Sequence, residues 1–276
     1  MAGLHTTIQF KEYVMKKLLA LTLLTFSSAS FATPIDLSSW SKVDYDVPGA
    51  QAASNWALSN ANQTVTQTVN ADPSLYRNGN NLTQYTMEGK WKVQSGAGDD
   101  DFMGFVFGYQ NEHQFYIMDW KKNRQSYAGG TAEAGFRILK IDANSKGDLI
   151  LNDFWGSNTL QSEILKSEFV DEGVGTPWVH GATYDFSLDF RKTTGDIAIK
   201  VMDGALTLWD IVLVDNTFMS GEFGFYNFSQ GNVEYSGFER TGGVPGQVPI
   251  PAAAFMFAPA LLGFMGLRRR AKNNVA

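Results

Sequence analysis

Alternation between apolar and polar residues dominates the chain after Ser54. Residues 85–93 place a tyrosine, a methionine, a tryptophan and a valine on one face and polar residues on the other, and residues 184–190 repeat the pattern. A period of two residues is typical of a strand that buries one face. Residues 160–169 fit either a helical turn or a strand. Many short strands without a long amphipathic helix predict an all-β fold, a two-sheet antiparallel jelly-roll sandwich.

One dense stretch, Asp99 to Tyr127, combines a triple aspartate with two aromatic runs. The runs Phe102–Tyr109 and Phe115–Trp120 flank the polar tip 110–113. This arrangement predicts a hairpin buried in a core. Aspartates at its entrance cannot be buried unpaired, so they must meet water, basic groups or a cation.

The first 32 residues have the layout of a secretory signal peptide. Two lysines follow Met15 and precede an apolar run and the small residues that end at Ala32. We therefore expect a leader at 1–32 that is cleaved after Ala32. Translation is expected to begin at Met15. The apolar run is too short for a membrane anchor, which needs ~20 residues.

At the other end, a Pro/Gly linker at 241–251 precedes an apolar run and a basic end at 252–276. This tail resembles sorting tails of the PEP-CTERM type, here as Val248-Pro249-Ile250-Pro251 with Ile250 where that family has glutamate. The resemblance implies a short hydrophobic helix, recognition by a bacterial exosortase and a basic end left in the cytoplasm. A plain membrane anchor is the alternative. Either places the domain at 33–240 outside the cytoplasm.

Charge narrows the choice of partners. Of the 22 basic residues, three lie in the leader and four in the tail; of the 28 acidic residues, one lies in the leader. The part of the chain between them therefore has 15 basic and 27 acidic residues, a net charge of −12. Such a surface repels nucleic acid and attracts cations, of which calcium suits carboxylate oxygens best. The chain has no cysteine, so it holds no disulfide or thiolate metal site.

The residues also carry a family resemblance. Residues 65–76, the block 99–127, residues 184–192 and residues 223–239 resemble the C-terminal domain of thrombospondins, over roughly Ser54 to Arg240. The resemblance implies a lectin-like sandwich of the concanavalin type, an extracellular location, calcium binding, and a role in adhesion and matrix interaction. The aspartate-rich repeats that precede this domain in thrombospondins are absent, and Ala71 stands where the family would have a cysteine.

Four aspartates are candidate calcium ligands. Asp99, Asp100 and Asp101 can supply several oxygens of a six-to-eight-coordinate shell. The alternative is a solvated acidic loop that protects a strand end. Asp72, before a proline, is the further candidate, and a turn in which it bonds its own backbone is at least as good an explanation.

Carbohydrate contact and catalysis are the other functions considered. Trp155 and Trp178 lie in loop-like contexts and are candidates for stacking on glycans, although tryptophan is more often a core residue. A hydrolase of this fold needs paired carboxylates, commonly as Glu-x-Asp, and the sequence contains no Glu-x-Asp and no Gly-x-Ser-x-Gly. We therefore expect a non-enzymatic calcium-binding protein that acts in adhesion or in the matrix, at the bacterial envelope or in the extracellular matrix. Its expected partner is a surface polysaccharide or protein. A lectin-like carbohydrate-binding module is the alternative.

Overall fold

The computed structural model describes residues 35–241, except for 48–50, 157 and 192–194. The leader expected at 1–32, nearly all of the linker expected at 241–251, and the helix and tail expected at 252–276 lie outside the described residues. Within the described residues, no helix has the length and apolar character needed to cross a membrane.

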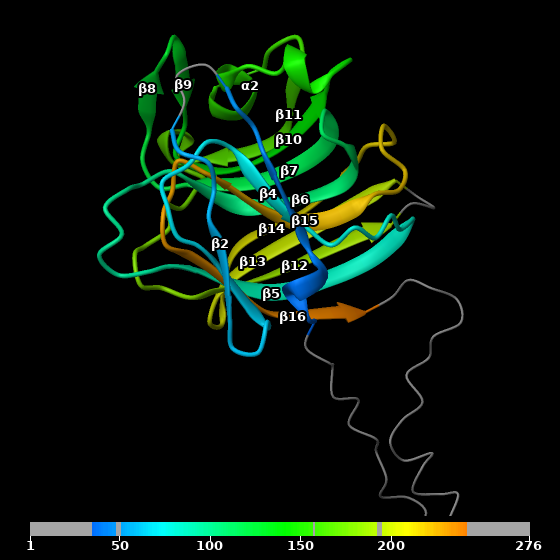
Figure 1. Cartoon of the computed structure of the whole chain (residues 1–276). Coiled ribbons are helices and arrows are strands. Elements are labelled where there is room, and N and C mark those ends of the chain that lie inside the picture. Colours follow the sequence, from blue (N-terminus) through cyan, green and yellow to red (C-terminus); the bar gives the residue numbers. More distant parts are fainter. Residues whose placement is uncertain (1–34, 48–50, 157, 192–194, 242–276) are drawn as a thin grey trace, which may run out of the picture. The chain divides into compact units, whose positions relative to one another are not determined.

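Two seven-stranded antiparallel sheets lie one above the other, as predicted for a sandwich (Figure 1). The first sheet has the order β1 (Ser41–Asp44), β4 (Ser74–Arg77), β15 (Glu222–Phe228), β6 (Phe102–Asn111), β7 (Gln114–Lys121), β10 (Gly135–Asp142), β11 (Ser162–Phe169). The second sheet has the order β14 (Leu206–Val214), β13 (Asp196–Asp203), β12 (Tyr184–Arg191), β5 (Gln84–Val93), β16 (Val233–Thr241), β3 (Thr64–Gln67), β2 (Trp56–Ser59).

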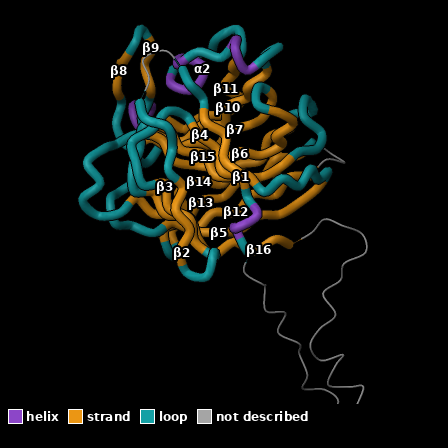
Figure 2. Tube along the Cα trace, in the orientation of Figure 1, coloured by secondary structure: helices purple, strands orange, loops and turns teal. Residues whose placement is uncertain are grey.

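Short elements lie before the first strand and on the connections between strands (Figure 2). They include a small two-stranded ribbon and one short α-helix that contacts it. The short elements are η1 (Leu37–Ser39), β8 (Gln125–Tyr127), β9 (Gly130–Ala132), η2 (Lys146–Asp148), α2 (Leu151–Trp155) and η3 (Val170–Glu172).

The main core fills the space between the sheets, and strands β5 and β12 supply much of it. Their tyrosines, phenylalanines and other apolar residues are buried at alternating positions, which confirms the predicted faces. Trp91 stacks on Phe186, with ring centroids 4.7 Å apart. Because aromatic rings bury large apolar areas, such pairs hold the two neighbouring strands in register.

The first sheet is also covered on its outer face, by a second apolar cluster. Phe115 and Ile117 of β7 belong to this cluster, whereas Tyr116 and Met118 point into the main core. The covering includes Tyr45 and residues of α2; Tyr45 lies 5.0 Å from the ring of Phe154. The predicted hairpin is therefore confirmed as β6 and β7, and it is buried on both faces.

The structure also answers two questions from the sequence, the conformation of residues 160–169 and the turn at Asp203-Gly204. The segment 160–169, which fitted a helical turn or a strand, forms the edge strand β11 from Ser162. The Asp203-Gly204 pair joins β13 to β14 as expected, with Gly204 at a φ of 56°. Glycine adopts such a positive φ at little cost, which is why it occupies this tight turn.

Close contact between β6 and β7 depends on Gly104. A Cβ atom placed there would lie 1.9 Å from the carbonyl oxygen of Met118 on the neighbouring strand. We predict that Gly104→Ala lowers the free energy of unfolding by about 3 kcal/mol, the upper end of the usual cost of overpacking, as measured by urea denaturation.

Gly147→Ala is the matched control, because a Cβ at Gly147 would meet only the Ser145 hydroxyl, at 3.7 Å. An equal loss in both variants would contradict the close-contact explanation.

Candidate functional site

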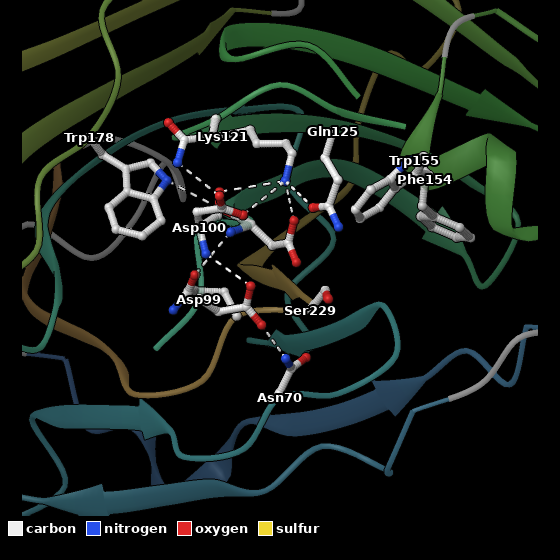
Figure 3. Close-up of polar contacts among 12 residues, drawn as sticks. Asn70, Asp99, Asp100, Lys121, Gln125, Phe154, Trp155, Trp178 and Ser229 are labelled. Carbon is white, nitrogen blue, oxygen red and sulfur yellow. Dashed lines mark hydrogen bonds and ion pairs between the residues drawn. The ribbon is translucent and has the colours of Figure 1, made fainter. Parts of the chain in front are cut away.

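The three consecutive aspartates lie on the loop that leads into β6, and the structure brings their side chains together. Ligand atoms of Asp99, Asp100 and Asp101 all lie within 4.8 Å of one another. Asp99 and Asp100 are half-buried, whereas Asp101 is only 2% exposed. The loop therefore presents two accessible carboxylates, those of Asp99 and Asp100 (Figure 3), and one buried carboxylate.

Polar residues from three other loops hold the two accessible aspartates. The Asn70 amide donates to the Asp99 carboxylate, and the Asn123 amide donates to the Asp100 carboxylate at 2.8 Å. The His180 Nε2–H donates to the Asp99 carbonyl oxygen at 2.9 Å. The cluster is thus a point at which distant parts of the chain meet, and it differs from a freely solvated acidic loop.

The third aspartate forms a buried ion pair with Lys121 at the end of β7. Lys121 is 0% exposed, and its ammonium group donates to the Asp101 carboxylate and lies 3.7 Å from an Asp100 carboxylate oxygen. Burial raises the pKa of Asp101 to about 6, although the lysine charge acts to lower it. A buried charge needs a partner, so each member of the pair fixes the position of the other.

A second buried ion pair lies nearby on the same outer face. The Arg137 guanidinium of β10 donates to both oxygens of Asp119, with Nε 2.9 Å from Oδ1 and Nη2 2.9 Å from Oδ2. Arg137 also donates to the Gly156 carbonyl oxygen at 2.6 Å, just after α2. Burial raises the pKa of Asp119, and Arg137 acts to lower it. This bidentate pair ties the helix that covers the sheet to the sheet itself.

Asp72 is not part of the three-aspartate group that the structure brings together. Its carboxylate accepts a hydrogen bond from the Gln51 backbone N–H at 3.0 Å. The bond reaches back 21 residues, whereas the turn considered above would bond Asp72 to its own local backbone. Burial raises the pKa of Asp72. Asp72 lines a separate cavity that Trp155 also lines.

Trp155 and Trp178, the candidates for stacking on glycans if exposed, are both buried. Trp155, the last residue of α2, is 3% exposed and packs in the outer apolar cluster, and Trp178 is 0% exposed and packs in the main core. The Trp178 indole N–H donates to the Asp101 carbonyl oxygen at 3.2 Å. Neither ring face is free to stack on a glycan at the surface, and Trp178 instead supports the aspartate loop.

The sequence interpretation missed Lys121 and Arg137, although the charged residues in the apolar run of β7 indicate that Lys121 is buried and needs a partner. In the apolar run of β7, Asp119 and Lys121 occupy alternate positions and so share one face. Charges inside a strand that is otherwise apolar on both faces must be paired by other charges. Their partners come from the aspartate loop and from β10, and pattern alone does not identify partners so distant in sequence.

The donor set fits a hard divalent cation. Carboxylate and carbonyl oxygens are the preferred ligands of calcium, and two half-exposed carboxylates leave room for water to complete the shell. The Lys121 ammonium forms an ion pair with the Asp101 carboxylate, so the carboxylates of Asp99 and Asp100 are the ones available to a metal ion.

Thrombospondins and cartilage oligomeric matrix protein are among the known proteins that are similar in sequence to this chain. A family model described as the thrombospondin C-terminal region matches residues 51–241. Thrombospondin-3b of Danio rerio is 30% identical over 212 residues, which are 74% of this chain and 22% of that protein. Cartilage oligomeric matrix protein of Bos taurus is 29% identical over 209 residues, 73% of this chain and 27% of that protein. The chain thus spans about a quarter or less of the length of these relatives.

Solved structures with a similar fold include carbohydrate-binding proteins of low sequence identity. The carbohydrate-binding module CBM66 from Bacillus subtilis has a TM-score of 0.49 at 12% identity and covers 74% of this chain and 96% of its own. The exoplasmic domain of VIP36 has a TM-score of 0.48 at 10% identity, with 79% and 90% covered.

The buried Lys121–Asp101 pair predicts a pH-dependent effect of mutation. Because the folded-state pKa of Asp101 is raised, its contribution to stability is fully present below pH 3.8 and is lost as the pH rises through about 6. Lys121→Met removes the compensating charge, so in metal-free buffer we expect a loss of about 3–5 kcal/mol at pH 7.5 and a much smaller loss at pH 4, measured by urea denaturation.

Lys90→Met is the control, because Lys90 pairs with Asp185 at the surface, where both side chains are nearly half exposed; we expect a change of at most ~1 kcal/mol at either pH. The additional change Asp101→Asn should restore part of the loss at pH 7.5. An equal loss at both pH values in Lys121→Met would disprove this description of the pair.

Proposed function

Because this chain belongs to the thrombospondin C-terminal family, we propose that its sandwich is an exported calcium-binding domain that acts in adhesion or matrix interaction. The observation that carries the proposal is the gathering of three aspartates within 4.8 Å at a junction of loops. The role is binding and not catalysis. Since the chain spans only part of its relatives, their partners are not transferred to it.

Calcium would be held by Asp99 and Asp100, with Asp101 kept in place by Lys121. Three carboxylates and one ammonium leave this cluster with a net negative charge even though the lysine is buried beside it. A bound calcium ion would supply the missing positive charge. Asn70 and Asn123 already bond to these carboxylates, so they would orient the ligand oxygens.

Calcium binding of this kind would order a surface formed by several loops. Asn70 precedes β4, Asn123 follows β7 and His180 precedes β12, and each contacts the aspartate loop. An ion at the junction would make the relative positions of these loops depend on calcium. Adhesion domains that work outside the cell, where calcium is abundant, use this dependence to keep their binding surface in shape.

Export to the cell envelope or extracellular matrix completes the proposal. The leader at 1–32 would direct the chain across the inner membrane, and the tail at 252–276 would sort or anchor it there, at least transiently through its hydrophobic helix. Surface polysaccharides and matrix proteins are the proposed partners. The acidic balance of the domain disfavours nucleic acid.

We predict that calcium raises the melting temperature of the protein and that Asp99→Asn combined with Asp100→Asn abolishes the rise. At a calcium concentration of 100 times Kd, binding adds about 2.7 kcal/mol, which corresponds to about 5–10 °C for a domain of this size. Differential scanning calorimetry with and without calcium measures the shift. Asp101 is left unchanged so that Lys121 keeps its partner.

Asp185→Asn is the control, because this carboxylate lies on β12 at the surface, paired with Lys90. It should retain the full calcium response. A wild-type melting curve that does not change with calcium would rule the proposal out. If calcium raises the melting temperature of the double variant as much as that of the wild type, the ion binds at a different site.

A further inference from the structure

Strand β14 is at one edge of the second sheet, and its outer edge is open. Among the described residues, β13 is the one strand that pairs with it. An edge strand presents a row of backbone N–H and C=O groups that can pair with a further strand. Proteins usually prevent such pairing by making the edge strand very short, or by placing lysine or proline in it.

The other three sheet edges have this protection, and β14 lacks it. Strands β1 and β2 are only four residues long, and β11 carries two glutamates and a lysine. Strand β14 has nine residues, contains neither lysine nor proline, and carries Asp210 as its one charged residue. Of the four edges, β14 is therefore the one best suited to accept another strand.

Apolar side chains are also exposed along β14. Leu206, Val212 and Val214 are 63%, 68% and 62% exposed, and they are three of the nine large apolar side chains exposed in the described part of the chain. Residues Trp209–Val214 pair with β13 without a register shift. In such a regular strand alternate residues share a face, so the two valines lie on the outer face of the sheet, opposite the buried Ile211.

The charge on β14 has a partner within its own sheet. Lys200 of β13 lies 3.5 Å from the Asp210 carboxylate. The exposed edge therefore presents a neutral pair and two valines, although the domain as a whole carries a net charge of −12. An approaching strand meets no uncompensated charge on β14 itself.

We propose that β14 pairs antiparallel with β14 of a second copy of this chain, about a two-fold axis at Val212. In this register the two copies of Val212 face each other, and Val214 faces Asp210 of the second copy. Cross-strand pairs of β-branched residues are stabilising, and a two-fold axis makes the contact self-complementary.

Asp210 decides between this register and the one centred on the strand. Centring the axis on Asp210 would place two carboxylates directly opposite each other, which is destabilising. With the axis at Val212, the two Asp210 residues are four positions apart along the strands, roughly 14 Å. Salt screens charges beyond about 8 Å at physiological ionic strength, so the two carboxylates hardly interact.

A contact along one strand edge is small, so the pairing is expected to be weak and reversible. Copies held close together on a surface would still pair, because their effective concentration is high. That location rests on the proposed function. The pairing itself does not, since β14 contributes no residue to the aspartate cluster.

Sedimentation equilibrium of the full chain in EGTA tests the inference, at about 0.15 M and about 0.5 M NaCl. The wild type is expected to dimerise, and more strongly at high salt, because salt screens the repulsion between two acidic domains. Val212→Lys should weaken dimerisation at least about tenfold, since each dimer carries the new charge twice. If circular dichroism shows that Val212→Lys is unfolded, Val214→Lys replaces it.

Ile150→Lys is the matched control. Ile150 is also an exposed apolar residue, at 47%, but it precedes α2 and lies on no strand. This variant should dimerise like the wild type.

Cross-linking tests the register, because the chain has no cysteine of its own. Under mild oxidation Val212→Cys should form a disulfide-linked dimer, since Cβ atoms of directly opposite residues lie about 5 Å apart. Asp210→Cys should not link to itself.

The inference is overturned if the wild type stays monomeric up to about 1 mM, if Val212→Lys and Ile150→Lys associate equally, or if high salt abolishes the dimer. Self-linking of Asp210→Cys in place of Val212→Cys overturns the register. Dimerisation in EGTA together with a melting temperature that does not respond to calcium supports the edge pairing and rejects the proposed calcium binding.

Discussion

The buried ammonium of Lys121 is the constraint on which the site depends. It lies at the end of a strand covered on both faces, where a charge without a partner would cost several kcal/mol. The chain meets this requirement by turning the aspartate loop inward so that Asp101 reaches it. Asp99 and Asp100 precede Asp101 on the same loop and stay half-buried beside it.

The same ion pair connects two features that are separate in sequence. On one side of Lys121 lies the aspartate cluster, and on the other its ammonium faces the Trp155 ring, which lines the cavity. The nearby Arg137–Asp119 pair holds the residues after α2 against the sheet, and so keeps Trp155 in place. Lys121 therefore contacts both the aspartate cluster and the aromatic ring that lines the cavity.

Much of the fold was predictable from the sequence because strand periodicity is a local property. The faces of β5 and β12 and the hairpin of β6 and β7 follow from alternation and turn residues that lie close together. The second covering of the first sheet was not predictable in this way. It depends on Tyr45 and on α2, which lie far from β7 in sequence and meet it only after folding.

The candidate site was predictable only in part. The three adjacent aspartates are evident in the sequence, and in the structure their carboxylate oxygens lie within 4.8 Å of one another. Which of them is buried depends on Lys121, and the apparent loop context of Trp155 and Trp178 concealed their burial. Local sequence identifies groups that need partners, whereas tertiary contacts decide which partners they receive.

Terbium luminescence tests the central claim, calcium binding at the aspartate loop, most directly. Terbium is a hard cation that takes oxygen ligands as calcium does, and the indole of Trp178, bonded to the Asp101 carbonyl oxygen, lies close enough to sensitise its emission. Excitation of tryptophan should produce terbium emission that added calcium removes. Absence of sensitised emission, or emission that calcium does not displace, would contradict the account.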